Sequence, residues 1–542
     1  MNYREKTWMK IPDPVPPEQI RGEYHADIVI LGGGHAGTAV ALAALEAGAT
    51  VILLEQQTEA GFRAFGAQFG ALNSKFAQER GAPVYDPLDF MEDYLHRSLN
   101  RANPFLIRQY AHHSGETLDW MLAHLPESIR DRVRLFMGRM PKHYSGLSNG
   151  FRTFLGTAMF PNVEPNGTIP PGPPLSLTPS VKALHKQIID LGGTIRYGLS
   201  CHDLIMENGA VVGAIGRNYK HEYWRFLAGK GVVLATGDFS GNKEMVMDQL
   251  QELAELTDYG ARYPFVPGGR KGAGIQLGLL AGGQMEPGPK GGMWACVRGG
   301  GGPMDGSACL RLNCNGERFT NEGIYGYWGA GLQGARQPDG PIVTLWDANW
   351  REELEYQAMD HTNVDLGDPL TMELRTLQME EAAQKGCCDT GGLPPGRAAA
   401  PNLLFAAQSL PELADKLGYS GQARTVFLEE VRRYNQLCAL GRDEDFCKDP
   451  NLLHPIVSPP FFGYREETPA VGTLMVTVCG LVVDRWQQVL DSGGQPIQGL
   501  YATGNCSGGR FPMMYTTPIS GISIGMAYTL GRVLGTHLAQ QK

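Results

Sequence analysis

The sequence has no surplus of basic residues, and it has few charged residues of either sign. Lys and Arg together number 47 against 56 Asp and Glu, and charged residues make up 19% of the 542 positions. Because binding to nucleic-acid phosphates needs clustered Lys and Arg, we expect no nucleic-acid partner. No apolar run approaches a membrane span, and residues 1–6 lack the apolar core of a signal peptide. We therefore expect no membrane insertion and a cytoplasmic location.

Paired cysteines are also missing. The ten cysteines form no C-x-x-C or C-x-x-C-H motif and no paired zinc spacing. This argues against a structural zinc, a bound haem or an iron–sulfur cluster, so we expect no metal site. Cys387 and Cys388 are adjacent, and a redox-active pair is one interpretation of them; buried or incidental thiols are the interpretation that a reducing cytosol favours.

What the sequence does contain is a dinucleotide-binding pattern near its start. An apolar run at 28–31 enters a glycine turn and then an alanine-rich helix. Gly32, Gly34 and Gly37 fit G-x-G-x-x-G, in which the glycines allow a tight turn, approach to a pyrophosphate and close helix packing. A second apolar strand ends in Glu55, at the spacing of about 20 residues where an acid holds ribose hydroxyls. Strand, glycines, helix, strand and acid in this order are a strong indication of a bound dinucleotide, with its phosphates at the helix N-terminus.

The rest of the chain predicts an interrupted domain. Buried strands run into glycine turns again at Lys230 to Gly237 and at Leu500 to Asn505. Between them, residues 286–454 lose the buried-strand pattern and contain two charged helices, at 369–385 and 422–440. We expect an N-terminal arm at 1–24, a dinucleotide-binding domain at 25–285 completed by 455–542, and an inserted domain at 286–454. The fold class is α/β: a Rossmann-type domain completed by C-terminal elements, with an inserted α+β cap domain.

Four motifs in order give the chain a family resemblance. They are the glycine turn with Glu55, Val233-Leu234-Ala235-Thr236-Gly237-Asp238-Phe239, Gly316-Glu317-Arg318-Phe319-Thr320-Asn321-Glu322, and Gly499-Leu500-Tyr501-Ala502-Thr503-Gly504-Asn505. With these motifs the chain resembles the flavoprotein family of fumarate reductase, succinate dehydrogenase, urocanate reductase and 3-ketosteroid Δ1-dehydrogenase. The resemblance implies FAD, a cap over the isoalloxazine, and hydride exchange between flavin N5 and a C–C bond next to an activating group.

The resemblance also implies how FAD is held. In the succinate dehydrogenase branch a histidine in the glycine-rich segment after the first βαβ unit attaches the flavin covalently. Residues 61–74 contain no histidine, so we expect non-covalent FAD. The expected FAD-binding residues are Gly32, Gly34, His35, Ala36, Gly37, Glu55, Gln56, Gly66, Ala67, Gly70, Ala71, Ala235, Thr236, Gly237, Asn242, Gly504, Asn505, Ser520, Ser523 and Ile524.

Two arginines of the fumarate reductases are absent. The position of their proton-donating arginine is Gly326, and their C-terminal arginine is replaced in Pro518-Ile519-Ser520-Gly521. A dicarboxylate needs bidentate arginine clamps, so we do not expect fumarate or succinate as substrate. The replacements resemble the ketosteroid dehydrogenase branch, in which tyrosines flank the substrate and a glycine N–H binds a ketone oxygen.

Tyr515, Tyr325 or Tyr327, and Gly521 are the candidates for these roles, and packing is the alternative for each tyrosine. The leading interpretation is therefore an FAD enzyme that acts on an α,β-unsaturated ketone, of steroid-like or similar size. It would need a small-molecule substrate and a soluble electron donor or acceptor.

Two other interpretations stay open. One is a reductase of an unsaturated carboxylate, of the urocanate or enoate type, with Arg510, Arg298 or Arg318 as a rearranged clamp; Arg318 and Arg510 are also alternative proton donors. The other is a flavin protein that passes electrons without turnover. The large inserted domain argues against it, because electron transfer alone needs no substrate chamber.

Overall fold

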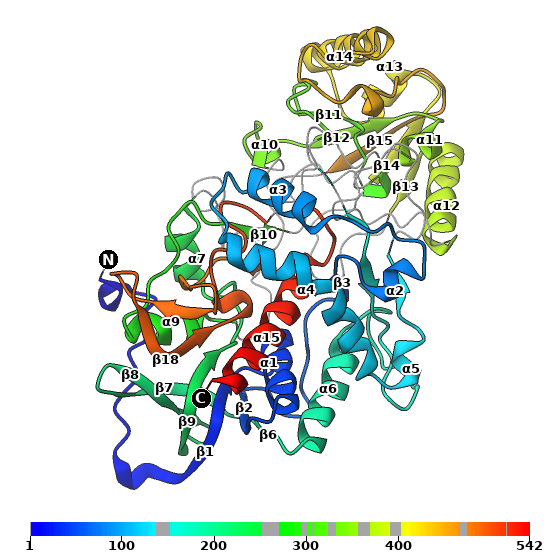
Figure 1. The fold of residues 1–542 in the computed structure, drawn as a ribbon. Helices are drawn as coiled ribbons and strands as arrows, with labels where there is room; N and C mark the ends of the chain where they lie inside the picture. The colour runs from blue at the N-terminus through cyan, green and yellow to red at the C-terminus, as the bar shows by residue number, and fades with distance from the viewer. Residues whose placement is uncertain are drawn as a thin grey trace.

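The computed structural model describes residues 2–136, 152, 154–251, 270–294, 302–304, 307–323, 332–355, 369–390, 403–466, 474–515 and 517–541. A sheet with a parallel centre organises the part of the molecule that holds both termini (Figure 1). Its strands follow the order β17 (Gln488–Leu490), β18 (Pro496–Ala502), β9 (Tyr223–Leu234), β1 (Ile20–Leu31), β2 (Val51–Glu55) and β6 (Thr194–Tyr197). From β18 to β6 each strand runs parallel to its neighbour. The predicted α/β fold class is confirmed.

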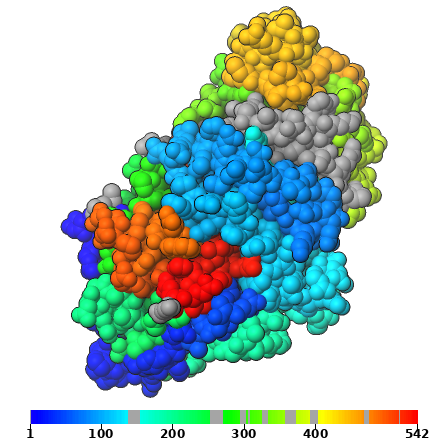
Figure 2. Space-filling model, in the orientation of Figure 1, coloured from blue at the N-terminus to red at the C-terminus, as the bar shows by residue number. Residues whose placement is uncertain are grey.

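The first and last helices pack together on this sheet. Helix α1 (His35–Glu46) follows β1, and α15 (Ile522–Gln540) closes the chain. At Gly531 an added Cβ would come within 2.7 Å of the carbonyl oxygen of Ala36, so the two backbones approach closely because the residues are small. In the space-filling view the C-terminal helix, in red, lies against the N-terminal elements, in blue (Figure 2).

An antiparallel extension leaves the sheet at β9. Strand β8 (Ala210–Arg217) pairs with β9 and with β7 (Ser200–Glu207), and α6 (Thr178–Asp190) precedes β6. A turn at Asn208-Gly209 joins β7 to β8, with φ of 49° and 82°. Positive φ at both residues is what a two-residue hairpin turn of type I′ requires.

Further elements surround this domain. A small sheet has the order β3 (Gln68–Gly70), β5 (Thr157–Met159) and β4 (Arg134–Leu135). Strand β5 is the central strand of this sheet. The remaining helices here are α2 (Lys75–Gln78), α3 (Pro87–Arg97), α4 (Pro104–Ala123), α5 (Glu127–Arg130), α7 (Lys243–Gln249) and α9 (Ala273–Leu280), with the 3₁₀ turns η1 (Tyr3–Glu5), η2 (Pro17–Gln19) and η6 (Gly504–Cys506).

The inserted segment forms a second sheet at the opposite end of the molecule (Figure 1). Its order is β11 (Leu310–Leu312), β12 (Ile342–Trp346), β15 (Phe461–Glu466), β14 (Leu403–Ala407) and β13 (Cys387–Asp389). The helical elements here are η3 (Gly302–Met304), α10 (Leu332–Ala335), α11 (Trp350–Leu354), α12 (Pro369–Lys385), α13 (Leu410–Lys416), α14 (Gly421–Leu440) and η5 (Pro450–Leu452). This part of the molecule is called the cap below.

Two of the predicted boundaries differ from where the strands lie. Strand β15 pairs with β12 and β14 of the cap, although it follows the expected end of the inserted domain at residue 454. Strand β1 begins at Ile20, inside the expected N-terminal arm, because its first residues pair with the long strand β9. The short pair β10 (Gly292–Trp294) and β16 (Leu474–Thr477) joins the two ends of the inserted segment.

Candidate active site

A cavity of about 670 Å³ opens where the parallel strands β1, β2 and β9 end. In an open α/β sheet this edge is where ligands bind. Most of the expected FAD-binding residues line this one cavity: Gly32, Gly34, His35, Ala36, Glu55, Gln56, Gly66, Ala67, Ala235, Thr236, Gly237, Gly504, Asn505, Ser523 and Ile524. The structure thus brings together residues that the sequence places hundreds of positions apart.

The glycine turn leaves room for a phosphate group. Gly34 lines the cavity, and a Cβ added there would meet nothing within 4 Å. The same holds for Gly237, in the segment that follows β9, where φ is 82°. Helix α1 begins at His35, and its first N–H groups have no acceptor within the helix. Open space beside free N–H groups at a helix N-terminus fits the pyrophosphate of FAD.

The carboxylate of Glu55 lies at the end of β2 and fits the ribose. Its Oε2 accepts from the backbone N–H of Gly33 at 2.8 Å, and Oε1 accepts from that of Gln57 at 2.7 Å. Burial raises the pKa of Glu55, and these N–H groups oppose the shift. Two carboxylate oxygens have about four acceptor sites, so capacity remains for two hydroxyl groups of a bound ribose.

Five expected FAD-binding residues do not line the cavity: Gly37, Gly70, Ala71, Asn242 and Ser520. At Gly37 an added Cβ would collide with the carbonyl oxygen of Gly32, and at Gly70 with that of Ser520, so both glycines allow close backbone packing. Ala71 is fully buried, and the Asn242 side chain accepts from Met245 N as the N-cap of α7. Direct contact of these residues with FAD therefore remains a prediction that this geometry does not favour.

The N-terminus of α15 forms another wall. Gly521 lies just before the helix with a φ of 74°, and Ser523 and Ile524 of the first turn line the cavity. Gly66 faces this turn so closely that an added Cβ would come within 2.6 Å of Cδ1 of Ile524. The first N–H groups and the positive dipole end of the helix therefore adjoin the cavity.

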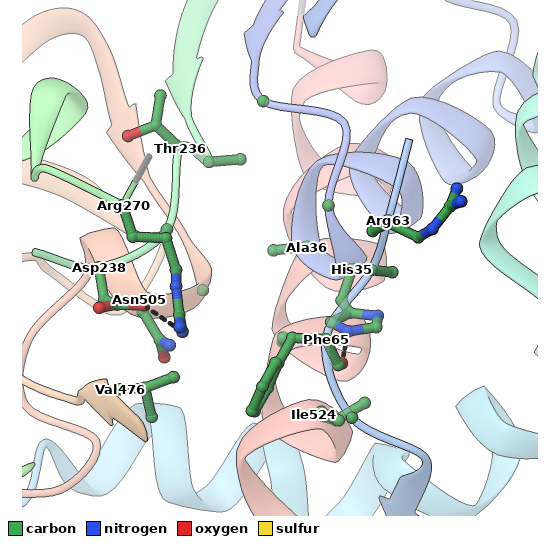
Figure 3. A pocket seen from close by; sticks show the side chains of 18 of the residues that line it. His35, Ala36, Arg63, Phe65, Thr236, Asp238, Arg270, Val476, Asn505 and Ile524 are labelled. Atoms are coloured by element: carbon green, nitrogen blue, oxygen red, sulfur yellow. Dashed lines mark hydrogen bonds and ion pairs between the residues drawn. The ribbon is translucent and has the colours of Figure 1, made fainter. Parts of the chain in front are cut away.

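Several residues that line the cavity were not expected from the sequence, among them Phe65, Asp238, Arg270 and Val476. Figure 3 shows Arg270, Asp238, Asn505 and Val476 on one side, facing His35 and Phe65 on the other. The Arg270 guanidinium donates to the carbonyl of Met475 at 2.8 Å and lies 5.1 Å from the centroid of the Phe65 ring. Arg63, Lys271, Met159, Leu175, Met293 and Met475 also line the cavity.

Partial signals for these residues exist in the sequence. Phe65 lies in the glycine-rich segment after β2, and Arg270 lies in a glycine cluster before α9. No local pattern marks Met293, Met475 or Val476, because strands far apart in the sequence bring them to the cavity.

Tyr515 and Gly521 line the same cavity as the glycine turn. The Tyr515 side chain is buried, and its ring lies 4.9 Å from that of Phe511. Tyr325 and Tyr327 lie outside the described residues, as does Arg298. Among the expected catalytic residues that the structure describes, Tyr515 and Gly521 line the cavity.

Arg318 lies elsewhere, in the cap. Its guanidinium is buried, with Nε and Nη2 each 2.9 Å from Glu322 and Nη2 2.7 Å from Asp443. Coulombic attraction and hydrogen bonds from these acids outweigh burial and raise the pKa of Arg318. Every guanidinium nitrogen is engaged by a carboxylate, so the geometry favours a structural role over proton donation or substrate clamping.

Comparisons with known proteins identify the family of the chain. Residues 27–523 match the FAD binding domain family, and the chain belongs to this family. It is 26% identical to the vinyl phenol reductase of Lactiplantibacillus plantarum, over 95% of this chain and 96% of that protein. It is 25% identical to a fumarate reductase (cytochrome) of Shewanella frigidimarina, over 95% and 77%, and 24% identical to a 3-oxosteroid 1-dehydrogenase of Mycobacterium tuberculosis, over 95% and 98%.

Solved structures show the same fold. The 3-ketosteroid-Δ4-(5α)-dehydrogenase of Rhodococcus jostii superposes with a TM-score of 0.64 at 20% identity, over 96% of this chain and 97% of that chain. The 3-ketosteroid Δ1-dehydrogenase of Sterolibacterium denitrificans gives 0.62 at 17%, over 96% and 100%.

The protein is therefore an FAD-dependent oxidoreductase that acts on CH–CH groups, of the fumarate reductase and ketosteroid dehydrogenase family. Among the helices described, none combines the length and apolarity needed to cross a membrane.

Proposed function

We propose that the enzyme exchanges hydride between FAD and the C=C or C–C bond of an α,β-unsaturated ketone, of steroid-like or similar size. The observation that carries this proposal is that Tyr515 and Gly521 line the same cavity as the glycine turn. A hydroxyl group and a backbone N–H are two neutral donors, which suit a neutral carbonyl oxygen. The methionines and Val476 at the wall supply the apolar surface that such a substrate needs.

Different residues of the chain would bind the cofactor, orient the substrate and exclude water. When bound, FAD supplies hydride exchange at flavin N5. Gly504 and Asn505 would border the ring, and the first N–H groups of α15 would favour negative charge at its pyrimidine edge. Tyr515 would hold the substrate oxygen or move the proton at the carbon next to the carbonyl. The Arg270–Phe65 approach would restrict entry and exclude water from the reacting bond.

One comparison favours a second candidate. The vinyl phenol reductase matches nearly the whole length of both chains, and its named substrate carries a C=C bond conjugated to a phenol ring. A flat aromatic alkene would also fit beside Phe65 and the methionines. Of the arginines expected to clamp an unsaturated carboxylate, Arg318 is held by two acids and Arg510 does not line the cavity. A carboxylate would have to bind Arg63, Lys271 or Arg270 at the cavity wall, and Arg270 is already paired with Asp238 at 3.3 Å.

Anaerobic turnover tests these candidates directly. The holoenzyme is supplied with reduced viologen and one substrate of each class: a steroid enone, an aryl enone, a vinyl phenol and an aryl enoate. We expect viologen oxidation with an enone, and desaturation of the saturated ketone with an artificial electron acceptor. Turnover of the enoate alone, or of the vinyl phenol alone, would contradict the enone proposal, and turnover of none would support the electron-transfer alternative.

A further inference from the structure

Arg510 is a fully buried cation next to the cavity wall. It follows the turn η6, which brings Gly504 and Asn505 to the cavity. Its Nη2 donates to Oδ1 of Asn505 at 2.8 Å, and its Nε lies 3.3 Å from the carbonyl oxygen of Ser507. Arg510 does not line the cavity itself, so it acts on a bound molecule through Asn505 and through its charge.

The charge of Arg510 has no close counter-ion in the described part of the chain. Both of its hydrogen-bond partners are neutral, and Nη1 is buried without a partner. Glu286 is the acid that acts on it electrostatically, yet the two make no ion pair within 4.0 Å. The carboxylate of Glu286 instead accepts from the N–H groups of Gly480 at 3.0 Å and Gly509 at 2.7 Å.

Three aromatic residues also lie near Arg510. Tyr94 donates to its carbonyl oxygen at 2.6 Å, the Phe511 ring centroid lies 5.2 Å from its guanidinium carbon, and Tyr515 is close enough to influence it. Burial of the guanidinium lowers the pKa of Arg510. A buried ion costs several kcal/mol after relaxation, and neutral partners offset this only in part. The cost falls when a negative charge forms nearby.

A hydride transfer to the cofactor produces such a charge. Two electrons and one proton added to the neutral flavin ring leave it with one negative charge. We propose that Arg510 is a positioning residue for the cofactor: it orients Asn505 toward the bound ring, and its charge favours the anionic, two-electron-reduced form of FAD. This inference rests on the proposed function, because that proposal places the flavin ring beside Asn505.

The first test uses the unaltered holoenzyme without substrate. The midpoint potential of bound FAD is measured by dye equilibration between pH 6 and 8. Uptake of one proton with two electrons changes the equilibrium tenfold per pH unit, which is about 30 mV for a two-electron couple. Twice this slope would mean a neutral reduced ring and would overturn the proposal.

The second test changes the charge. Arg510→Met should lower the ratio of reduced to oxidised FAD at a fixed potential by about tenfold, or about 30 mV. Arg510→Lys should keep most of the wild-type value. Arg532→Met is the matched control, because Arg532 is an arginine of α15 that pairs with Glu116 at 3.1 Å. A wild-type potential in Arg510→Met overturns the proposal.

Loss of folding or of FAD in Arg510→Met would leave two decisive measurements. The first is the pH slope of the wild-type midpoint potential. The second is the midpoint potential of Asn505→Leu, which we expect to be lower than that of wild type. An unchanged potential in Asn505→Leu would also overturn the proposal. All these potentials are measured without substrate. A holoenzyme with the expected potentials but no enone turnover would contradict the proposed function alone, and the reverse result would contradict this inference alone.

Discussion

Tyr515 is the residue whose hydroxyl group matters most to the proposed reaction. The substitution Tyr515→Phe keeps the buried ring against Phe511 and removes only the oxygen. General acid–base contributions run to about 10²–10⁴-fold, so we expect turnover to fall within that range while FAD content stays unchanged. Steady-state assays with the substrate found in the viologen test measure the fall.

A matched control separates chemistry from packing. Tyr419 is also buried, and its hydroxyl donates to the carbonyl of Asn313 in the cap at 2.8 Å. Tyr419→Phe should change stability by about 1 kcal/mol and leave turnover unchanged. Full activity in Tyr515→Phe would show that this tyrosine only packs, and Arg270 at the cavity wall would become the better candidate.

The glycine-rich segment 61–74 predicts that the flavin is not covalently attached. It supplies Gly66 and Ala67 to the cavity, but it contains no histidine to form a covalent link. His35 does line the cavity, yet it lies at the start of α1, and its Nε2 is 2.7 Å from the carbonyl oxygen of Phe65. Acid precipitation should therefore release all the flavin into the supernatant. Yellow colour in the washed pellet would refute this.

Helix α11 of the cap holds a carboxyl group that makes stability depend on pH. Glu353 is buried and accepts from the thiol of Cys309 at 3.0 Å, and burial raises its pKa to about 7 from a usual 4.5. The folded state therefore keeps a proton that the unfolded chain loses. The stability that this proton provides is fully present below about pH 4.5 and is lost as pH rises toward 7.

The substitution Glu353→Gln should remove this dependence. Each pH unit between the two pKa values corresponds to about 1.4 kcal/mol, so the variant should gain about 3 kcal/mol over wild type between pH 4 and pH 8. Urea unfolding of both proteins at the two pH values measures the difference. Glu352→Gln, one residue earlier and exposed, serves as the control. Parallel pH dependence in Glu353→Gln and wild type would contradict the assignment.

Elements with a local pattern could be predicted from the sequence, and elements made by distant pairing could not. The charged helix α12 spans 369–385 as expected, and strand β6 follows a glycine pair that marks its start. Strand β1 begins earlier than expected, since its first half alternates in burial and pairs with β9 rather than forming a buried run. Strand β5 is three residues long, too short for any period to show.

The same contrast applies to the candidate site. The glycine turn, Glu55 and the Gly504-Asn505 turn each carry their own motif, and all three reach the cavity. Val476 carries none, because its place depends on the pairing of β10 with β16. Arg318 pairs with Glu322 and Asp443 only in the folded cap. The sequence alone does not show this pairing, so it leaves Arg318 as a candidate for binding a substrate or donating a proton.

For the whole molecule, the position of the cavity couples FAD binding to stability. Its walls come from the N-terminal α1, from the end of β9 in the middle of the chain, and from the C-terminal α15. A ligand that binds only the folded state adds about 2.7 kcal/mol at a hundred times its dissociation constant. We therefore expect the apoprotein to melt at a lower temperature than the holoprotein, and the gap to widen with added FAD.

Two glycine substitutions test whether this coupling runs through the glycine turn. Gly34→Val places a side chain in the open space where the pyrophosphate would lie, so its apoprotein should melt like wild-type apoprotein and gain nothing from FAD. Gly37→Val should instead lower the melting temperature of the apoprotein itself, because its Cβ would collide with the carbonyl of Gly32. Differential scanning fluorimetry with and without FAD distinguishes the two. If FAD raises the melting temperature of Gly34→Val as much as that of wild type, the phosphates do not lie at this glycine turn. The candidate site described here would then be wrong.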